Sequence, residues 1–349
     1  MPEFQVNGRA IGPGHPCYVI AEMSANHAGS FDKALAIVRA AKESGADAIK
    51  LQTYTPDTMT IDCDNEYFQL HHPLWKDKTL YQLYKEAQTP WAWHRPLKEE
   101  ADRLGLDFFS TPFDETAVDL LEGLGVGVYK IASFELVDDL LLKRVAQTRK
   151  PVIMSAGMST LEEVRRAVEI LRANGTEQLA LLRCVSAYPA RAEEMDLALI
   201  RDMAVRFNVV TGLSDHTTDS LSSIAGVAAG ASIIEKHFKL SGDDTSPDAA
   251  FSLTPPQFHA LVSDVRRTEA ALGRAVYGPV TSEKGSLKFR RSLFFVMDLA
   301  AGAVVTAPSI RVIRPGDGLA PREREKILGR RLKKAVGRGQ PVSWEDLDA

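Results

Sequence analysis

Two histidines occupy matching positions in two polar motifs, Ser214-Asp215-His216-Thr217 and Glu235-Lys236-His237. Each motif comes at the end of a short apolar run that is typical of a buried strand. Neighbouring strands lie about 4.8 Å apart, so His216 and His237 could share one divalent metal ion whose shell carboxylates and water complete. The alternative is that each imidazole forms only structural hydrogen bonds, and the residues alone favour neither interpretation.

Two lysines, Lys50 and Lys130, also lie in apolar strand-like runs, and hydroxyl residues follow both of them. Lysine supplies a point charge, and serine and threonine supply short donors, which together suit a phosphate or a carboxylate. The alternative is that these lysines only form internal ion pairs with Glu22 or Glu135. Because an unpaired buried charge is costly, two such lysines favour the ligand site.

These side chains need a scaffold that brings strand ends together. Before residue 240 the chain repeats a short apolar run, a polar turn and an amphipathic segment. The predicted strands are Tyr18–Met23, Ala48–Thr53, Asp107–Thr111, Val128–Ala132, Val152–Ser155, Leu179–Val185, Val209–Leu213 and Ser232–Phe238. Eight alternating strand–helix units predict a closed (β/α)₈ barrel, whose polar groups gather at the carboxyl ends of the strands. The chain lacks the GxGxxG fingerprint of many doubly wound sheets.

The pattern changes after the eighth predicted helix, Thr254–Leu272. We expect a barrel domain over 1–275, a linker over 276–290 in which glycine and proline interrupt any periodicity, and a small domain over 291–349. The small domain has few apolar residues in its sequence, so we expect its persistence to depend on docking to another surface.

Composition excludes several classes of protein. The chain has 349 residues and a formal net charge of −4, so it has no broad attraction for nucleic acid or anionic membranes. It has no apolar run of membrane-spanning length and no signal-peptide pattern at its start. Three widely spaced cysteines, Cys17, Cys63 and Cys184, indicate a reducing compartment, and we expect a cytoplasmic protein. Cys184 lacks an obvious base in the sequence and is expected to belong to the core.

The connection Tyr54–Lys78 is longer than an ordinary loop between a strand and a helix. Its aromatic and imidazole side chains are Tyr67, Phe68, His71, His72 and Trp75. Two interpretations are equally supported: a lid over a sugar, or a segment that packs on the barrel rim or on a neighbouring subunit.

Four motifs at the predicted strand ends are Ile20–His27, Ser110–Asp114, Ser214–Thr217 and Ile234–Phe238. Together they resemble the signature of the sialic acid synthase family. The resemblance extends to the C-terminus, where Arg311–Gly318 is similar to that family's small antifreeze-like (SAF) domain. Within the family, some stretches look more like the pseudaminic acid synthases than the neuraminate synthases. These are Glu22–His27, Leu51–Thr60, Leu74–Lys76, Ser133–Glu135 and Pro247–Leu253.

The resemblance implies a TIM barrel followed by the SAF domain, and an enzyme that condenses phosphoenolpyruvate with an open-chain amino sugar and water, releasing phosphate by C–O cleavage. The implied catalytic residues are Glu22, Glu135, His216 and His237, and the two histidines would bind a divalent metal, Mn²⁺ before Mg²⁺ or Co²⁺. The implied phosphoenolpyruvate ligands are Lys50, Thr111, Lys130, Ser133, Ser155 and Ser214. The implied sugar ligands are Gln52, Tyr188, Asp248 and Arg314, the last reaching over from the partner subunit of a domain-swapped homodimer.

The pseudaminic-like stretches imply 2,4-diacetamido-2,4,6-trideoxy-L-altrose as the sugar. The alternative is a neuraminate or legionaminate synthase that uses the same chemistry on a manno-configured sugar. Ser186, Ala249 and Thr218-Asp219 depart from the wider family's pattern, and all three lie on the sugar side. Two rivals of other classes are an aldolase that forms a Schiff base through Lys50 or Lys130 and a non-catalytic carbohydrate-binding protein. The polar strand ends argue against the second, because binding alone needs neither two lysines nor a histidine pair.

Overall fold

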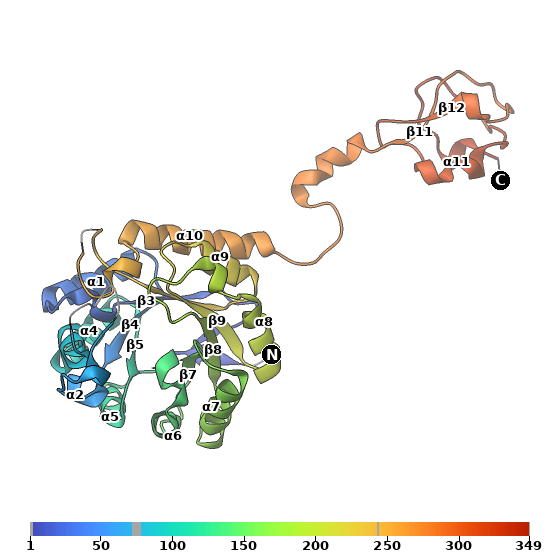
Figure 1. The fold of residues 1–349 in the computed structure, drawn as a ribbon. Coiled ribbons are helices and arrows are strands. Elements are labelled where there is room, and N and C mark those ends of the chain that lie inside the picture. The colour runs from blue at the N-terminus through green and yellow to red at the C-terminus, as the bar shows by residue number, and fades with distance from the viewer. Residues whose placement is uncertain (1–2, 72–77, 243, 349) are drawn as a thin grey trace. The chain divides into compact units, whose positions relative to one another are not determined.

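The computed structural model describes residues 3–71, 78–242 and 244–348, which divide into two compact units, Met1–Gly273 and Arg274–Ala349. In the first unit eight parallel strands close into a barrel, with helices around its outside (Figure 1). The strands are β3 (Tyr18–Glu22), β4 (Ala48–Thr53), β5 (Asp107–Pro112), β6 (Tyr129–Ile131), β7 (Val152–Ser155), β8 (Leu179–Cys184), β9 (Val210–Asp215) and β10 (Ile233–His237). Pairing of β10 with β3 closes the sheet, so the predicted barrel is confirmed.

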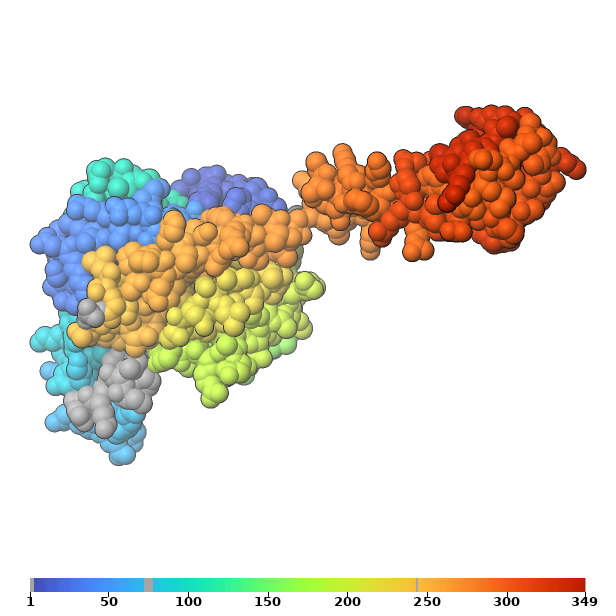
Figure 2. All heavy atoms as spheres, turned by 90° about the horizontal axis from the view of Figure 1, so that it is seen from above, coloured from blue at the N-terminus to red at the C-terminus, as the bar shows by residue number. Residues whose placement is uncertain are grey.

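The helices that cover the barrel are amphipathic, as their sequences predict. They are α1 (Phe31–Glu43), α2 (Pro56–Met59), α3 (Leu80–Ala87), α4 (Trp91–Arg103), α5 (Glu115–Leu124), α6 (Asp139–Ala146), α7 (Leu161–Ala173), α8 (Ala198–Phe207), α9 (Leu221–Ala228) and α10 (Pro255–Leu272). In α7 the side chain of Thr160 accepts a hydrogen bond from the Glu163 N–H, and the apolar face that includes Val164 and Val168 is buried. Figure 2 shows α10 lying between α1 and α9 on the outside of the barrel. Over the part of the chain that the structure describes, no helix is long and apolar enough to cross a membrane.

The barrel interior is filled by side chains from alternate positions of the strands. An inner cluster includes Tyr18 and Ile20 of β3, Ala180 and Leu182 of β8, and Ile233 of β10. Polar side chains then continue the same inward series at the carboxyl ends of the strands. The core therefore supports a polar layer at one end of the barrel.

An N-terminal hairpin, which the sequence analysis did not predict, packs into this inner cluster. Its strands β1 (Phe4–Val6) and β2 (Arg9–Ile11) pair antiparallel. Phe4, Val6 and Ile11 are buried against the inner cluster of the barrel. Because the strands have only three residues each, they are too short for a local periodicity to predict them. The hairpin closes the end of the barrel opposite to the polar layer.

The second unit contains β11 (Ser292–Phe295) paired antiparallel with β12 (Ile310–Ile313), and the short helix α11 (Arg324–Ile327). The 3₁₀ helix η7 (Thr281–Phe289) precedes β11 and has no buried residue. Although its sequence has few apolar residues, this unit has a buried apolar cluster of its own, and its docking to another surface stays a prediction. Its buried cluster consists of Leu293, Phe295, Val305, Ile310, Ile327, Leu332, Val336, Val342 and Leu347. These residues are scattered singly along the chain, so only the fold brings them together.

Candidate active site

Most of the predicted site residues surround one small hollow of about 50 Å³ at the carboxyl ends of the barrel strands. The predicted residues in its lining are Glu22, Lys50, Gln52, Thr111, Lys130, Ser133, Ser155, Tyr188, Ser214, His216 and His237. Every strand of the barrel except β8 ends on or next to one of them. This convergence follows from the parallel sheet, in which all strands end at the same side.

The two lysines share a buried carboxylate that the sequence analysis did not assign. Glu235 lies 3.7 Å from Lys50 and 3.9 Å from Lys130, and Lys50 also pairs with Glu22 at 2.7 Å. Internal ion pairs with Glu22 are thus present, but no ion pair joins Glu135 to either lysine among residues 3–71, 78–242 and 244–348. Alternation along β10 could have identified Glu235, because it stands two positions before His237 and so faces the same way.

Burial and neighbouring charges shift the ionisation of this cluster. Burial, reinforced by the Glu235 carboxylate, raises the pKa of Glu22 to about 7, although Lys50 acts in the opposite direction. Against the effect of burial, Lys130 and Lys50 lower the pKa of Glu235. Burial lowers the pKa of Lys130. At neutral pH the cluster therefore contains one firmly ionised carboxylate and one that is partly protonated, beside two lysines.

Each lysine donates a hydrogen bond to a hydroxyl group that also lines the hollow. Lys50 Nζ donates to Thr111 Oγ1 at 3.1 Å, and Lys130 Nζ donates to Ser155 Oγ at 2.7 Å. Each pair joins a lysine to the strand that follows it in the barrel order, since Thr111 lies on β5 and Ser155 on β7. Adjacent strands thus place a cation and a hydroxyl side by side, as phosphate binding requires.

The remaining two serines, Ser133 and Ser214, also line the smaller hollow. Ser214 Oγ donates to Glu235 Oε1 at 3.1 Å. Ser133 Oγ accepts a hydrogen bond from the Gly157 N–H at 3.0 Å. A Cβ at position 157 would come within 2.7 Å of Ser133 Oγ, so glycine is required for this close approach. The loop after β7 therefore lies directly against the hollow.

The two histidines lie side by side, with ring centroids 5.3 Å apart. His216 Nδ1 donates to the Val185 carbonyl at 2.8 Å, which leaves Nε2 as the nitrogen with a free lone pair. Burial lowers the pKa of His237 well below its ordinary value, so its imidazole is neutral, and its Nδ1 has no hydrogen-bond partner among the described residues. Although burial acts in the opposite direction, Cys184 raises the pKa of His216, so that ring must lose a proton before it can bind a metal. With that proton lost, each ring offers one free nitrogen, which fits the two protein ligands of a divalent ion.

No cluster of three or more His, Cys, Asp or Glu residues with metal-binding geometry occurs within the described ranges. A metal held by His216 and His237 would therefore need further ligands from carboxylates that move, from water or from substrate. Glu235 Oε2 is a buried oxygen without a hydrogen-bond partner in the same hollow, as far as the described chain extends.

Cys184 was expected in the apolar core, and this interpretation was wrong. The side chain is buried, but it lines the hollow, with its Sγ 3.8 Å from His216 Nδ1. Although burial acts in the opposite direction, the neighbouring His216 lowers the pKa of the thiol to about 7. In β8 the inward series Ala180, Leu182, Cys184 could have placed it here.

A larger cavity of about 480 Å³ shares part of this lining, including Gln52, Tyr188 and His237. It contains the two remaining barrel residues of the predicted site, Glu135 and Asp248. Burial raises the pKa of Glu135 to about 7, and its Oε2 has no hydrogen-bond partner in the described structure. The two hollows are therefore neighbouring parts of one site.

Two of the shared side chains are held by defined contacts. Gln52 Nε2 donates to Glu22 Oε1 at 3.2 Å. The Tyr188 ring lies 4.5 Å from the His216 ring, centroid to centroid, and 5.0 Å from that of Phe251. Gln52 thus connects the larger cavity to the lysine cluster, and Tyr188 connects it to the histidine pair.

Much of the remaining lining of the larger cavity is apolar. It is formed by Met59, Leu83, Tyr84, Phe113 and Phe134, among others. Met59 belongs to α2, inside the long connection after β4, so part of that connection lines the cavity. Of its predicted aromatic residues, Tyr67 is exposed, whereas His72 and Trp75 lie outside the described residues.

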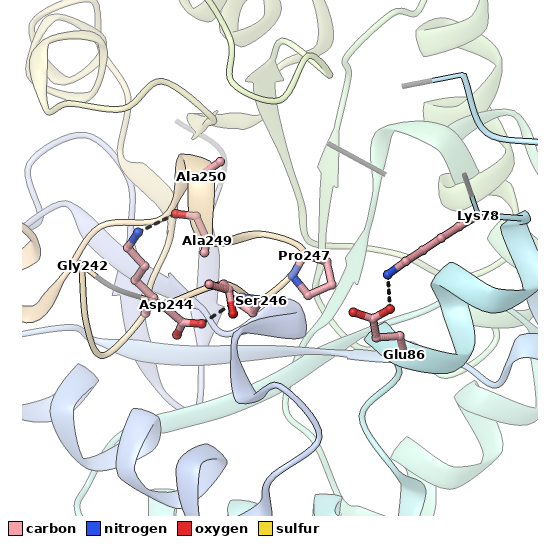
Figure 3. A pocket seen from close by; sticks show the side chains of 10 residues that line it. Lys78, Glu86, Gly242, Asp244, Ser246, Pro247, Ala249 and Ala250 are labelled. Atoms are coloured by element: carbon pink, nitrogen blue, oxygen red, sulfur yellow. Dashed lines mark hydrogen bonds and ion pairs between the residues drawn. The ribbon is translucent and has the colours of Figure 1, made fainter. Parts of the chain in front are cut away.

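A third hollow of about 370 Å³ lies on the loop between β10 and α10, and Figure 3 shows the residues that line it. Its charged groups are already engaged with one another or with backbone. Lys239 Nζ donates to the Ala249 carbonyl at 2.7 Å, and Lys78 pairs with Glu86. Pro247 lines both this hollow and the larger cavity, so the loop separates the two.

Arg314 is the one predicted site residue in the second unit. It is exposed and follows β12 directly, and the described residues offer it no hydrogen-bond or ion-pair partner. Its contact with a sugar stays a prediction.

Comparison with known proteins agrees with this geometry. The model of the NeuB family matches residues 37–277, and that of the SAF domain matches residues 290–348. The chain is 41% identical over 335 residues to the pseudaminic acid synthase of Helicobacter pylori, covering 95% of this chain and 98% of that one. It is 40% identical over 332 residues to the pseudaminic acid synthase of Campylobacter jejuni strain 81-176, covering 94% and 96%.

More distant matches extend over the whole length. The N,N'-diacetyllegionaminic acid synthase of Legionella pneumophila is 35% identical over 354 residues, covering 99% of both chains. The crystal structure of a spore coat polysaccharide biosynthesis protein from Bacillus subtilis superposes with a TM-score of 0.68, at 31% identity and 99% coverage of both chains. The chain therefore belongs to the NeuB family of phosphoenolpyruvate-dependent nonulosonic acid synthases, with a SAF domain after its barrel.

Proposed function

We propose that this chain is a pseudaminic acid synthase, which condenses phosphoenolpyruvate with 2,4-diacetamido-2,4,6-trideoxy-L-altrose and water to give pseudaminic acid and phosphate. The observation that carries the chemistry is the buried cluster of Lys50, Lys130 and Glu235 beside the His216–His237 pair. The choice of sugar is supported by the 40–41% identity to two pseudaminic acid synthases, against 35% to a legionaminic acid synthase.

In this proposal the smaller hollow holds phosphoenolpyruvate. Lys50 and Lys130 both lie beside Glu235, and the partial protonation of Glu22, whose pKa is about 7, reduces the negative charge that an anion would meet there. The carboxylate and phosphate of phosphoenolpyruvate would also accept hydrogen bonds from the nearby hydroxyl groups. The proposed ligands are Lys50, Thr111, Lys130, Ser133, Ser155 and Ser214.

The larger cavity holds the amino sugar, with its aldehyde toward the histidines. His216 and His237 would hold a divalent metal, Mn²⁺ by preference, which supplies Lewis-acid polarisation of the aldehyde oxygen. Gln52, Tyr188 and Asp248 line the cavity on its polar side and would contact the sugar. The apolar part of the lining suits a 6-deoxy sugar, whose C6 is a methyl group.

The proposed reaction develops a positive charge that Glu135 would stabilise. C3 of phosphoenolpyruvate forms the new bond to the aldehyde carbon, and positive charge develops at C2. The buried Glu135 carboxylate would offset this charge, and Glu22 would orient the aldehyde and the water that adds at C2. Cleavage of the C2–O bond then releases inorganic phosphate together with the former bridging oxygen.

We also propose a homodimer in which Arg314 of one subunit donates hydrogen bonds to an acetamido group of the sugar bound by the other. A guanidinium presents several donors in a planar fork, which suits an amide carbonyl. Its exposure on the second unit leaves those donors available.

The test is phosphate release from phosphoenolpyruvate with three amino sugars. They are the L-altro sugar named above, its 2,4-diacetamido-2,4,6-trideoxy manno relative, and N-acetylmannosamine. We expect the highest kcat/KM with the L-altro sugar. Preference for either manno sugar would replace the proposed product with legionaminic or neuraminic acid.

The bond that breaks can be tested in the same reaction. With phosphoenolpyruvate labelled by ¹⁸O in the bridging position, C–O cleavage delivers the label to phosphate. Label retained in the sugar acid would contradict the proposed cleavage. Borohydride with a carbonyl substrate should trap no adduct, because the condensation needs no imine.

A further inference from the structure

Ser24 has a backbone conformation that serine rarely adopts. Its φ is +46°, in the left-handed region, and the residue is buried at the start of the 3₁₀ helix η1 (Ser24–His27). A side chain in this region is strained, and glycine is the residue that occupies it without penalty. Such strain at a site persists where the side chain has a use that glycine could not serve.

The Ser24 hydroxyl joins two of the proposed sugar ligands. It donates a hydrogen bond to Asp248 Oδ2 and accepts one from Gln52 Nε2 at 2.9 Å. The N–H of Ala25 donates to the same Asp248 oxygen at 3.1 Å. One hydroxyl therefore connects strand β4, through Gln52, with the loop after β10, through Asp248, and all three side chains line the larger cavity.

The loop that carries Asp248 has a separate anchor. Asn26 Nδ2 donates to Ser252 Oγ at 2.8 Å and to the Phe238 carbonyl at 3.0 Å. Ser246 Oγ donates to Asn26 Oδ1 at 2.7 Å, which ties down the segment of the loop drawn in Figure 3. Because Asn26 holds the loop at both ends of this segment, the Ser24 hydroxyl and the Ala25 N–H are left to orient the Asp248 carboxylate itself.

We propose that Ser24 is a positioning residue for the amino sugar: its hydroxyl sets the direction of the Asp248 carboxylate and the Gln52 amide, at the expense of a strained backbone. The proposal rests on the proposed function only in taking the larger cavity as the sugar site. We therefore expect Ser24 to affect binding of the sugar and not of phosphoenolpyruvate, since none of the six proposed phosphoenolpyruvate ligands forms a hydrogen bond with it in the described structure.

The test is Ser24→Gly, which removes the hydroxyl and relieves the strain together. We expect the KM for the amino sugar to rise about tenfold or more, because a hydrogen bond to a charged group is lost. We also expect the KM for phosphoenolpyruvate to stay within about twofold and the melting temperature to stay equal or to rise. Ser24→Ala should show the same kinetic loss without the gain in stability.

Ala28 provides a matched control, because its φ is +47° and it is exposed outside the cavity. Ala28→Gly should change the melting temperature in the same direction and leave both KM values unchanged. An unchanged sugar KM in Ser24→Gly overturns the positioning role, and so does an equal rise in both KM values.

A crystal structure of Ser24→Gly separates this proposal from the proposed function. We expect the Asp248 carboxylate to turn away from the Ala25 N–H, and a carboxylate that keeps its place would overturn the proposal whatever sugar the enzyme uses. If the wild-type enzyme prefers another sugar of the panel, the kinetic comparison is made with that sugar. In that case only the proposed product is wrong.

Discussion

The two halves of the site are built in different ways. The proposed phosphoenolpyruvate half consists of buried charges on barrel strands, such as Lys50, Lys130 and Glu235, each at a fixed inward position. The proposed sugar half combines one strand residue, Gln52, with groups on loops, of which Asp248 is held by hydrogen bonds to its carboxylate. A strand position is determined by the sheet, whereas a loop position depends on a few local contacts.

This difference indicates which part of the site can tolerate substitution of its side chains. Removing one partner from a buried ion cluster leaves an uncompensated charge and typically costs about 3–5 kcal/mol of stability, so the strand half tolerates little variation. Exchanging a loop side chain costs far less and alters the shape and polarity of the cavity. The same barrel can thus keep one reaction while its relatives use different amino sugars.

Loss of the metal should have the largest effect, because His237 lines both hollows and the His216 ring lies beside it. We expect exhaustive chelation to abolish phosphate release and added Mn²⁺ to restore it. His216→Ala should remain folded by circular dichroism and fail to bind Mn²⁺ in equilibrium dialysis, whereas the exposed His259→Ala should behave as wild type. Full activity after chelation would remove the metal from the mechanism.

Glu135→Gln should have the next largest effect, because it removes charge from the boundary of the sugar half without changing its shape. We expect kcat to fall by about 10²–10³, the usual cost of losing one preorganised electrostatic partner. The KM for phosphoenolpyruvate should change little, as steady-state kinetics with each substrate varied will show. A change confined to KM would mean that Glu135 serves binding alone.

The pH dependence of the same variant gives a second measurement. Burial raises the pKa of Glu135 to about 7, so its active ionised form is lost, and kcat falls, as the pH drops through about 7. The raised pKa means that the folded state binds more protons than the unfolded state, so this group lowers stability as pH rises from about 4.5 to about 7. Glu135→Gln should lose both effects, and its stability relative to wild type should increase over that range in urea titrations.

Arg314→Ala should have the smallest effect, confined to the sugar half. We expect the KM for the sugar to rise about tenfold, the value of one hydrogen-bonded charged group, with the KM for phosphoenolpyruvate unchanged. Arg311→Ala, which removes an exposed arginine from the preceding strand β12, is the control. If the arginine acts across a dimer, mixing the Arg314→Ala protein with the Glu135→Gln protein should regenerate activity. If subunit exchange is verified and no activity returns, Arg314 does not act in the partner's site.

Local patterns in the sequence were sufficient for the barrel and for much of its polar layer. Short apolar runs separated by segments with helical periodicity predicted all eight strands, and the strand-end positions of Lys50, Lys130, His216 and His237 predicted that they meet. These features depend on the geometry of single elements and on the parallel order of the sheet. The geometry of single elements is encoded in short stretches of the chain, and the parallel order follows from the alternation of strands and helices along it.

The tertiary structure alone decided which groups touch. It assigned Glu235 to both lysines, moved Cys184 from the expected core to the side of His216, and joined Ser24 to Asp248 across 224 positions of sequence. It also closed the barrel with an N-terminal hairpin and gathered a core in the second unit. Contacts of this kind depend on distances between segments that are remote in the chain, and no local periodicity encodes such distances.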